Sequence, residues 1–373
     1  MTGRRADFTL KPCTFADLPR WENDDATCLL EPLRKCLDYV KKTKPYRVGS
    51  LGLLSDDLAA VATTIPTAAS TTPERARHFF ETSFVPFMIQ PSDGRRGFVT
   101  AFYEPVVEVS DRPDDVYCYP FYRPPVDLIE IADGNRPDGW PADYRFGRRT
   151  GEEISIYPDR RAIDSGLLEG RGLEIAWAKS SVDVFFAHVQ GAAQLLFPDG
   201  QTRRITYAAK NGHPFTGIGR HLIDIGEIPE SQISMQAIRA WLRDNPARVE
   251  EILWTNRSYI FFRESLVDDP ALGPIAAAKV QLVPGRSLAV DREIHTFGFP
   301  LFVHAETITH IDDERPFARL MLAMDTGSAI VGPARGDIFT GSGDLAGEHA
   351  GAVRSAADFY ILIPKDAASR YIP

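Results

Sequence analysis

Apolar positions in the first ninety residues recur at the spacing of α-helices. Between residues 24 and 42 a single stripe combines Leu29, Leu33, Cys36, Leu37 and Val40. Intervals of three and four predict a helix here. A second helix is predicted to begin at Thr72-Pro73-Glu74, because Thr caps helices and Pro suits the first helical position. Its apolar face is expected to consist of Phe79, Phe80 and Phe84.

The pattern changes to short strands near residue 97. The run "GFVTAFYEPVVEVS" is rich in β-branched and aromatic residues, and residues 105–206 alternate such runs with Pro, Gly and Asp. This composition predicts short strands joined by turns. "LLFPDGQTRRITYAA" predicts a hairpin, because Pro198-Asp199-Gly200 is typical of a turn.

Helices are predicted again over residues 231–254. The first has an apolar face with Ile238, Trp241 and Leu242 and ends at Asn245-Pro246; we expect the same Asn to cap the next helix. That second helix has its apolar side formed by Val249, Ile252 and Leu253. From residue 280 onward the pattern is short β again, in "RSLAVD", "FPLFVHAETIT", "FARLMLAMD" and "DFYILIP".

This layout predicts a mainly β protein with a helical N-terminal part. Strands that follow one another without intervening helices disfavour a doubly wound fold. The middle, residues 105–206, is expected to be a β-barrel inserted into a discontinuous domain built from residues 1–104 and 207–373. A length of 373 residues agrees with two or three domains, or one with an insertion.

Composition excludes some classes of protein. No run approaches the roughly 18 apolar residues of a membrane span, and the net charge of −9 argues against a nucleic-acid partner. The N-terminal residues contain no apolar signal core and no lipidation Cys, so the chain is either cytoplasmic or lacks a removed targeting segment.

The four cysteines give no metal or redox motif. Cys28 and Cys36 lie on one predicted helix, separated by about 12 Å of rise, which is too far for a disulfide. Cys36 is therefore expected in the core, whereas a bridge between Cys13 and Cys118 stays open.

Two further motifs do not fit the functions that they suggest. Gly341-Ser342-Gly343-Asp344-Leu345-Ala346 matches a loose dinucleotide fingerprint, but too few residues follow for the βαβ unit and ribose acid that the motif needs. We therefore interpret it as a glycine-rich turn. A metal cluster of His304, Glu306, His310 and Asp312 is disfavoured, because His310 lies across a predicted turn from the first two residues.

Aspartic-protease chemistry is the more serious alternative. Asp325-Thr326-Gly327-Ser328 follows an apolar run, and a second such motif, Asp164-Ser165-Gly166, occurs earlier. Proteases of this kind share one proton between two such acids. However, Asp164 lies in a charged, turn-like context, and too little chain follows Asp325 to build a second β-rich lobe.

Three aspartates remain in the C-terminal segment. Asp291, Asp325 and Asp337 each lie where a strand is expected to meet a turn of small residues. Turns of small residues let carboxylates approach a ligand closely, so these three acids are candidates for acid–base chemistry.

Several motifs together resemble the membrane-bound lytic murein transglycosylase A family. They are "FYEP" at 102–105, "DVFFAHVQG" at 183–191, residues 207–246, "PGRSLAVDR" at 284–292 and "MDTGSAIVGPARGDIFTGSGDLAGEHAG" near the end. The resemblance implies a double-psi β-barrel domain with a three-aspartate (3D) signature and a second small inserted β-barrel, the two forming the walls of a glycan groove. It implies cleavage of the β-1,4 bond between MurNAc and GlcNAc of peptidoglycan, leaving a 1,6-anhydro-MurNAc end.

The same resemblance assigns roles to residues. Asp337 matches the catalytic acid, and we expect Asp325 to be its partner. Asp291, Thr100, Tyr103, Gln190, Tyr207 and Asn211 match positions that bind substrate or line the groove. This chain departs from the family's usual residues at Ala192-Ala193, Met324 and Ser328, which affects the sugar subsites rather than Asp337.

Such an enzyme needs no metal or cofactor. Its partner is expected to be the glycan strands of peptidoglycan, and the chain is expected to act as a periplasmic monomer, with membrane anchoring open through a removed N-terminal segment. A non-catalytic polysaccharide-binding protein is the alternative from another class.

Overall fold

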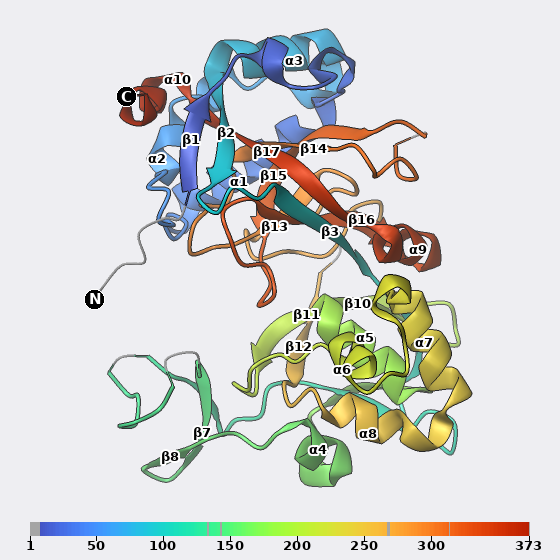
Figure 1. Ribbon diagram of the computed structural model, residues 1–373. Coiled ribbons are helices and arrows are strands. Elements are labelled where there is room, and N and C mark those ends of the chain that lie inside the picture. Colours follow the sequence, from blue (N-terminus) through green and yellow to red (C-terminus); the bar gives the residue numbers. More distant parts are fainter. Residues whose placement is uncertain (1–7, 133, 142–143, 267–268, 313, 373) are drawn as a thin grey trace. The chain divides into compact units, whose positions relative to one another are not determined.

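The computed structural model describes residues 8–132, 134–141, 144–266, 269–312 and 314–372. The chain folds into two compact units. Unit 1 comprises Met1–Tyr103, Asp269–Gly341 and Leu345–Pro373, and unit 2 comprises Glu104–Asp268 and Ser342–Asp344. Each unit is described by itself (Figure 1).

Unit 1 is built on an eight-stranded sheet whose members form a closed ring of six. The ring consists of β14 (Pro300–Ala305), β15 (Phe317–Asp325), β13 (Ser287–Val290), β16 (Arg335–Ser342), β3 (Gly97–Glu104) and β17 (Arg354–Pro364). β17 closes it, because its first residues pair with β3 and its later residues pair with β14. β2 (Phe84–Pro91) pairs with β17, and β1 (Phe8–Pro12) pairs with β2. The expected β-barrel domain is therefore present.

Uninterrupted apolar runs explain why these strands are buried. β14 is buried at every position, and in β15 only Arg319 and Asp325 have partial exposure. Strands that are apolar on both faces are typical of sheets covered on both sides. One face lies inside the ring, and the N-terminal helices pack into the same core cluster.

In the N-terminal lead, the described residues between β1 and β2, the chain forms three α-helices and several short 3-10 turns. The α-helices are α1 (Leu30–Lys42), α2 (Ser55–Ala59) and α3 (Pro73–Ser83). The 3-10 turns are Phe15–Asp17, Trp21–Asn23, Thr27–Leu29, Ala62–Thr64 and Ala68–Ser70. Thr72 caps α3 by accepting from the backbone N–H of Arg75, as predicted. Phe84 does not belong to the helix: it opens β2 and packs edge-on against Phe79.

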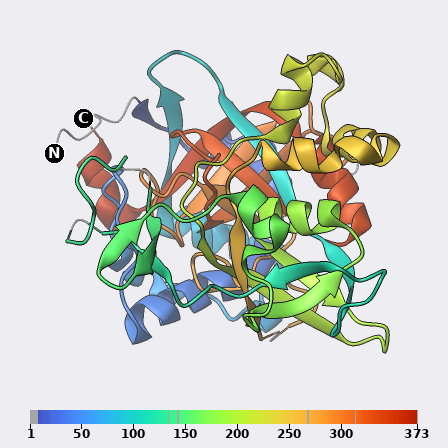
Figure 2. The same cartoon turned by 90° about the horizontal axis from the view of Figure 1, so that it is seen from below.

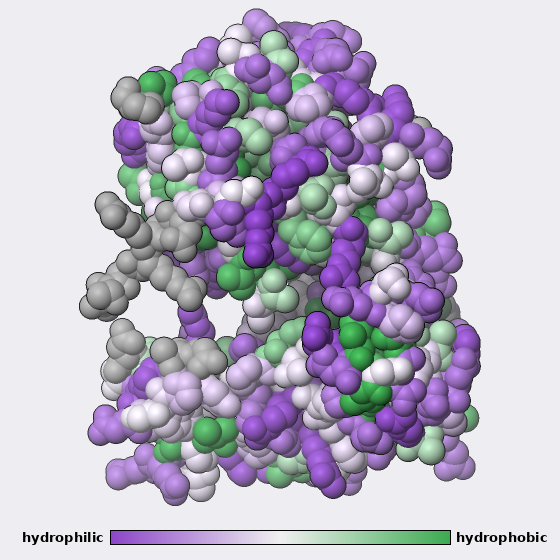
Figure 3. Space-filling model, viewed as in Figure 1, coloured by the Kyte–Doolittle hydropathy of each residue, from purple (hydrophilic) through white to green (hydrophobic). Residues whose placement is uncertain are grey.

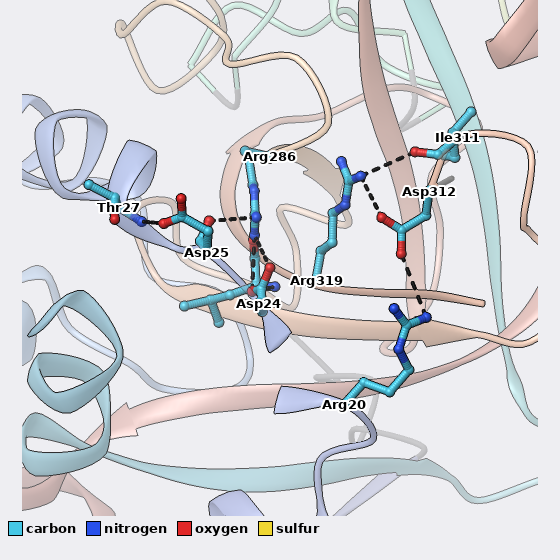
Figure 4. Close-up of polar contacts among 9 residues, drawn as sticks. Arg20, Asp24, Asp25, Thr27, Arg286, Ile311, Asp312 and Arg319 are labelled. Carbon is cyan, nitrogen blue, oxygen red and sulfur yellow. Dashed lines mark hydrogen bonds and ion pairs between the residues drawn. The ribbon is translucent and has the colours of Figure 1, made fainter. Parts of the chain in front are cut away.

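A buried ion-pair network joins this lead to the barrel (Figure 4). The guanidinium of Arg286 lies 2.7 Å from Asp24 and also donates to the carbonyls of Leu320 and Asp25. Asp24 accepts in turn from the backbone N–H of Leu320. In a neighbouring ion pair, Nη2 of Arg319 lies 2.7 Å from Oδ1 of Asp312. Complementary charges thus hold together segments that are far apart in the sequence.

Unit 2 contains a six-stranded sheet in the order β12-β11-β10-β4-β9-β5. Its strands are β4 (Val106–Ser110), β5 (Tyr119–Tyr122), β9 (Glu174–Ala178), β10 (Ala192–Leu196), β11 (Thr202–Lys210) and β12 (Ile260–Ser265). The predicted hairpin is confirmed as β10 and β11, with Gly200 at φ 82° in the turn. The two end strands of the sheet also touch, since the rings of Phe121 and Phe262 lie 5.8 Å apart.

Five α-helices of unit 2 are α4 (Arg160–Ala162), α5 (Ser181–Gln190), α6 (Ile218–Asp224), α7 (Met235–Asp244) and α8 (Val249–Trp254). A π-turn, Ile163–Leu167, and 3-10 turns at Glu230–Gln232 and Pro246–Arg248 accompany them. α7 and α8 agree with the predicted helices, but Asn245 caps the end of α7, by donating to the Trp241 carbonyl, rather than the start of the next helix. α5 departs from the prediction, which has only strands and turns over residues 105–206.

The inserted unit is longer than the sequence pattern predicts. The predicted insert ends at residue 206, whereas the compact unit continues to Asp268. The physical reason is strand pairing: β11 crosses residue 206 and pairs with β12, so residues 260–265 cannot leave that sheet. Helices α6 to α8 lie between those two strands in the chain and pack onto α5.

A small arm completes unit 2. It consists of β6 (Leu128–Glu130), β7 (Phe146–Thr150) and β8 (Glu153–Ser155), which form a separate antiparallel sheet. Both ribbon views place this arm at the opposite end of the unit from α7 and α8 (Figure 1 and Figure 2).

The remaining helices are α9 (Asp344–Ala352), α10 (Lys365–Ala368) and the 3-10 turn Ser369–Tyr371. Polar residues cover most of the face shown in Figure 3, and apolar residues gather there in small groups. Within the described residues, no helix combines the length and the apolar character needed to cross a membrane. Cys36 is buried as predicted, and Cys13, Cys28, Cys36 and Cys118 are all free thiols.

Candidate active site

Asp325 and Asp337 lie on either side of one strand of the barrel. β13 is the central strand of three, parallel to β15 and antiparallel to β16. Ala289 of β13 is the register partner of Asp325 on one side and of Asp337 on the other. Register partners project to the same face of a sheet. The two carboxyl groups therefore project from the same face of the sheet, on either side of the smallest side chain that an L-residue can offer.

A β-bulge makes this arrangement possible. Leu288 pairs with Ala323, but the next residue, Ala289, pairs with Asp325, so that Met324 is the extra residue. Bulges near active sites re-aim side chains that a regular register would direct elsewhere. Without the extra residue, Met324 would oppose Ala289 and Asp325 would extend beyond the pair. Asp337 lies inside strand β16, and not at the strand end that the sequence pattern predicts.

Burial raises the pKa of both acids, and for Asp325 the charge of Asp337 contributes as well. Desolvation raises the pKa of Asp337 to about 6, against the opposing effects of Thr100 and Arg335. Desolvation likewise raises the pKa of Asp325 to about 6, and the charge of Asp337 adds to the rise. Backbone N–H groups, including that of Ala277 at 3.2 Å, stabilise the Asp325 carboxylate and act in the other direction. Two neighbouring acids of this kind titrate as a coupled pair.

A short relay orients the Asp337 carboxyl. Arg335 donates to the hydroxyl oxygen of Thr100 at 2.7 Å, and the Thr100 hydroxyl donates to Oδ1 of Asp337. Because a guanidinium can only donate, it leaves the Thr100 proton free to point at Asp337. Oδ1 is therefore an acceptor, and a proton on this carboxyl belongs on Oδ2. Thr100, predicted as a substrate-binding residue, lies in direct contact with Asp337.

Both carboxylate oxygens of Asp291 accept hydrogen bonds from the backbone. Its two oxygens accept from the N–H groups of Glu293, at 3.0 Å, and Gly332, at 2.8 Å. The buried ring of His295 donates to the carbonyl of Pro333 at 2.7 Å. These bonds tie the loop before β16 to the end of β13. They fix the strand that carries Asp337.

Unit 2 brings two of the predicted sugar-binding residues together. Gln190 is the last residue of α5, and Gly191 follows it in the left-handed conformation, with φ 76°. The carbonyl of Gly191 accepts from the backbone N–H of Tyr207 at 2.8 Å. Gln190 is partly exposed, and Tyr207 is 41% exposed.

The other two predicted groove residues are buried. The ring of Tyr103 lies against α9, where a Cβ on Gly347 would come within 2.8 Å of it. Asn211 has no exposed surface, and its amide bonds the backbone of Pro158, Arg257 and Tyr259. The geometry gives Asn211 a supporting role in unit 2.

The competing motifs take ordinary structural positions. Asp164 lies on a short helical turn and accepts from the indole of Trp254 at 3.1 Å, so it does not end a strand as a protease aspartate would. The turn at Gly343, with φ 85°, leads into α9, whose first residue is Asp344. An acid at a helix N-terminus disfavours a phosphate there. His304 lies 3.8 Å from Asp358 on the neighbouring strand.

Sequence reasoning missed three residues of the site. Arg335 precedes Asp337 by two positions, and alternation along a strand could have placed both side chains on one face. Ala289 looks like an ordinary strand residue between Leu288 and Val290. Lys279 lies in a loop before β13, and no local pattern connects it with Asp325.

Comparison with known families and structures agrees with this architecture. Residues 98–263 match the MltA specific insert domain, and residues 286–363 match the 3D domain. The fold and site thus define a 3D-domain barrel that carries a specific insert.

Similarity to individual solved structures identifies the family within this class. A crystal structure of membrane-bound lytic murein transglycosylase from Agrobacterium tumefaciens is 58% identical with a TM-score of 0.91, and the match covers 98% of this chain and 100% of that one. A structure of Escherichia coli MltA with bound chitohexaose is 25% identical with a TM-score of 0.67, covering 97% and 96% of the two chains. The chain belongs to the membrane-bound lytic murein transglycosylase A family.

A curated relative from Vibrio cholerae, "Membrane-bound lytic murein transglycosylase A", is 31% identical over 258 residues. The match covers 68% of this chain and spans 61% of the relative's length.

Proposed function

We propose that the protein is a lytic transglycosylase that cleaves the β-1,4 bond between MurNAc and GlcNAc in peptidoglycan. The observation that carries this proposal is the pair of carboxyls that flank Ala289 on one face of the sheet, each with a pKa raised to about 6. Membership of the transglycosylase family supports it.

Asp337 serves first as acid and then as base. Its protonated Oδ2 donates to the glycosidic oxygen as the bond to the muramoyl C1 breaks, and GlcNAc leaves as an alcohol. The resulting Asp337 carboxylate takes the proton of the muramoyl C6 hydroxyl as that oxygen bonds to C1. A group that must both give and take a proton works best when its pKa lies near the working pH. A pKa of about 6 meets that requirement.

One carboxyl acts in both steps because the nucleophile belongs to the substrate. Ordinary glycosidases need a second carboxylate, either to attack C1 or to activate water. Here the C6 hydroxyl is tethered to the reacting sugar, so its effective concentration is high without any base for water. Asp325 then remains as the charged partner, which keeps the proton on Asp337 and stabilises positive charge that develops at C1.

Thr100 and Arg335 keep this carboxyl in one orientation. The relay fixes Oδ1 as an acceptor, so Oδ2 presents its proton in every turnover. Asp291 acts on Asp337 indirectly, by accepting from the backbone of Gly332 in the loop that leads to β16. We therefore place Asp291 as a positioning residue.

Gln190 and Tyr207 are the best candidates for sugar contacts in unit 2. An aromatic face packs against the apolar face of a sugar ring, and a primary amide both donates to and accepts from hydroxyls. Their proximity at the end of α5 makes them one platform. Asn211 supports the backbone beneath this region and does not contact sugar.

The relatives' names describe membrane-bound proteins. We therefore propose that the mature protein acts in the periplasm, attached to a membrane by a segment outside the described fold. Fractionation of cells that express the full-length gene product tests this: the proposal expects the protein in a membrane fraction, and recovery from the cytoplasm contradicts it.

Incubation with purified murein sacculi tests the activity. The expected products carry 1,6-anhydro-MurNAc ends, which are one water lighter than hydrolysed ends. Hydrated reducing ends would instead indicate a muramidase, and binding to sacculi without any release would indicate a non-catalytic binding protein. Either result contradicts the proposal.

A further inference from the structure

A hairpin formed by residues 273–282 contacts Asp325 through the backbone N–H of Ala277. Residues 273–282 of unit 1 fold back on themselves, with Ile275 bridged to Gln281. The buried side chain of Gln281 locks its base by donating to the carbonyls of Asp269 and Gly273. Its tip is tied to the barrel, because the N–H of Ala278 donates to the Met324 carbonyl at 2.9 Å.

The tip carries Lys279 in a strained backbone conformation. Lys279 has φ 63°, in the left-handed region, a feature that it shares with only Arg20 and Glu314 among the non-glycine residues that the structure describes. Left-handed backbone costs free energy for any residue with a Cβ, whereas glycine adopts it freely. The chain nevertheless has a lysine here. Strain that persists in a rigid segment beside an active site is a reason to look for a function of the side chain.

Lys279 follows Ala277 by two residues on this hairpin and acts electrostatically on Asp325. The same hairpin donates the N–H of Ala277 to Oδ1 of Asp325. The charged groups that act on Asp325 are Lys279, from the hairpin, and Asp337, from β16. Arg335 acts on Asp337. Each member of the pair thus has its own cation: Lys279 for Asp325 and Arg335 for Asp337.

We propose that Lys279 is a positioning residue that holds the negative charge of the pair on Asp325, so that the single proton lies on Asp337. This inference rests on the proposed acid–base role of Asp337. When the two carboxyls together carry one proton, that proton can lie on either acid, and only the arrangement with protonated Asp337 can start the reaction. A cation on the Asp325 side favours that arrangement, because opposite charge stabilises the ionised form.

Three substitutions separate charge from strain. Lys279→Arg keeps the cation, Lys279→Ala removes it and keeps a Cβ, and Lys279→Gly removes both the cation and the strain. Lys279 is exposed, so solvent weakens its effect on Asp325. We therefore expect loss of the charge to move the acid limb of the pH–rate profile on murein sacculi upward by about half a pH unit and to lower the maximal rate severalfold.

The strained backbone predicts a second, opposite effect. Lys279→Gly should unfold at a higher temperature than Lys279→Ala, because only glycine relieves the left-handed conformation. Both variants should show the same shifted profile, and Lys279→Arg should follow the parent profile. A purely structural role for Lys279 would change rate and stability together and leave the limb of the profile in place.

The outcomes are distinguishable from those of the activity test. If the parent protein yields anhydro products and the profiles of the Ala and Gly variants superimpose on it, the inference about Lys279 is overturned while the proposed function stands. If the parent protein shows no turnover, the proposed function fails. A ¹³C NMR titration of the Asp325 carboxyl then decides the inference: a higher pKa in Lys279→Ala supports it, and an unchanged pKa contradicts it.

Discussion

At the scale of single residues, the raised pKa that suits Asp337 for proton transfer lowers the free energy of unfolding at neutral pH. The ordinary pKa of an Asp carboxyl is 3.8, and burial raises that of Asp337 to about 6. Well below pH 3.8 the carboxyl is protonated in both the folded and the unfolded chain, so there is no cost. As the pH rises from about 3.8 to 6, the unfolded chain ionises while the folded chain keeps its proton. Stability is therefore lost across this window, and the loss is complete above it.

Replacement of Asp337 by Asn should therefore stabilise the protein at neutral pH. A difference of about two pKa units corresponds to at most ~3 kcal/mol, and coupling to Asp325 reduces it. Chemical denaturation from about pH 4 to pH 8 should show a gain of about 1–3 kcal/mol for Asp337→Asn at the upper end that disappears toward the lower end. Asp111→Asn, at an exposed position, is the matched control and should show no such trend. A gain that is independent of pH would contradict this explanation.

Among the candidate residues, only those that belong to a sequence motif were predictable from the sequence. Asp325 and Asp337 could be singled out by their surroundings of small residues and by the family resemblance. Their burial, the Thr100 hydroxyl and the guanidinium of Arg335 could not, because those contacts join β3 to β16, strands that are distant in the sequence. For Asn211 the sequence suggested a sugar contact, whereas its amide is buried, and burial of this kind could not be predicted from the sequence either.

At the scale of elements, the site depends on register. Ala289 is 4% exposed and lies between the two acids, so a larger side chain there must displace at least one of them. Small errors in placement are costly in catalysis, up to about 100-fold for a displacement of ~1 Å.

Ala289→Val should accordingly lower turnover at least ~10-fold while the protein still binds sacculi. Ala289→Ser is the matched control, since it adds a single oxygen and should retain most activity. Circular dichroism and a thermal melt establish that both variants fold. Turnover of the Val variant close to that of the Ser variant would contradict the proposed geometry.

Elements with regular patterns were predictable, and those with irregular ones were not. The stripe of α1, the capped start of α3 and the turn of the β10–β11 hairpin follow local rules. α5 was missed because its central residues, from Val184 to His188, are all buried, which leaves no polar face to reveal a helical period. The extent of β16 was not predicted, because "RGDIFTGS" contains two glycines and an aspartate, which favour turns, so that Asp337 was expected at the end of a strand. A bulge such as that at Met324 has no signal in the sequence.

At the scale of the whole molecule, the N-terminal lead is part of the barrel domain rather than an appendage. Its helices share one core cluster with the ring of strands. The Asp24–Arg286 pair adds a polar tie within this core (Figure 4). Burial raises the pKa of Asp24 even though Arg286 opposes the rise, so the pair depends on both partners being present.

Asp24→Asn should destabilise the protein by about 3 kcal/mol, because it leaves the Arg286 charge buried without its partner. The matched control is Asp38→Asn, which breaks the exposed pair with Lys42 and should cost less than about 0.5 kcal/mol. Denaturation with urea measures both. Equal effects of the two substitutions would show that the lead contributes little through this contact.

The arrangement of two units was predictable, but the boundary was not. The sequence pattern places the start of the insert at residue 105, and unit 2 starts at Glu104. Its end lies in the pairing of β11 with β12, two strands that enclose three helices. The spacing of apolar residues predicts whether a segment is a helix or a strand, but it does not predict which strands pair with each other.

The most direct test of Asp337 as both acid and base compares the parent protein with Asp337→Asn on purified murein sacculi, with mass spectrometry of the soluble products. We predict anhydro-muropeptides from the parent protein, and none from Asp337→Asn even though that variant still sediments with sacculi. Anhydro products released by Asp337→Asn at a rate near that of the parent protein would contradict the role of Asp337 in both proton transfers.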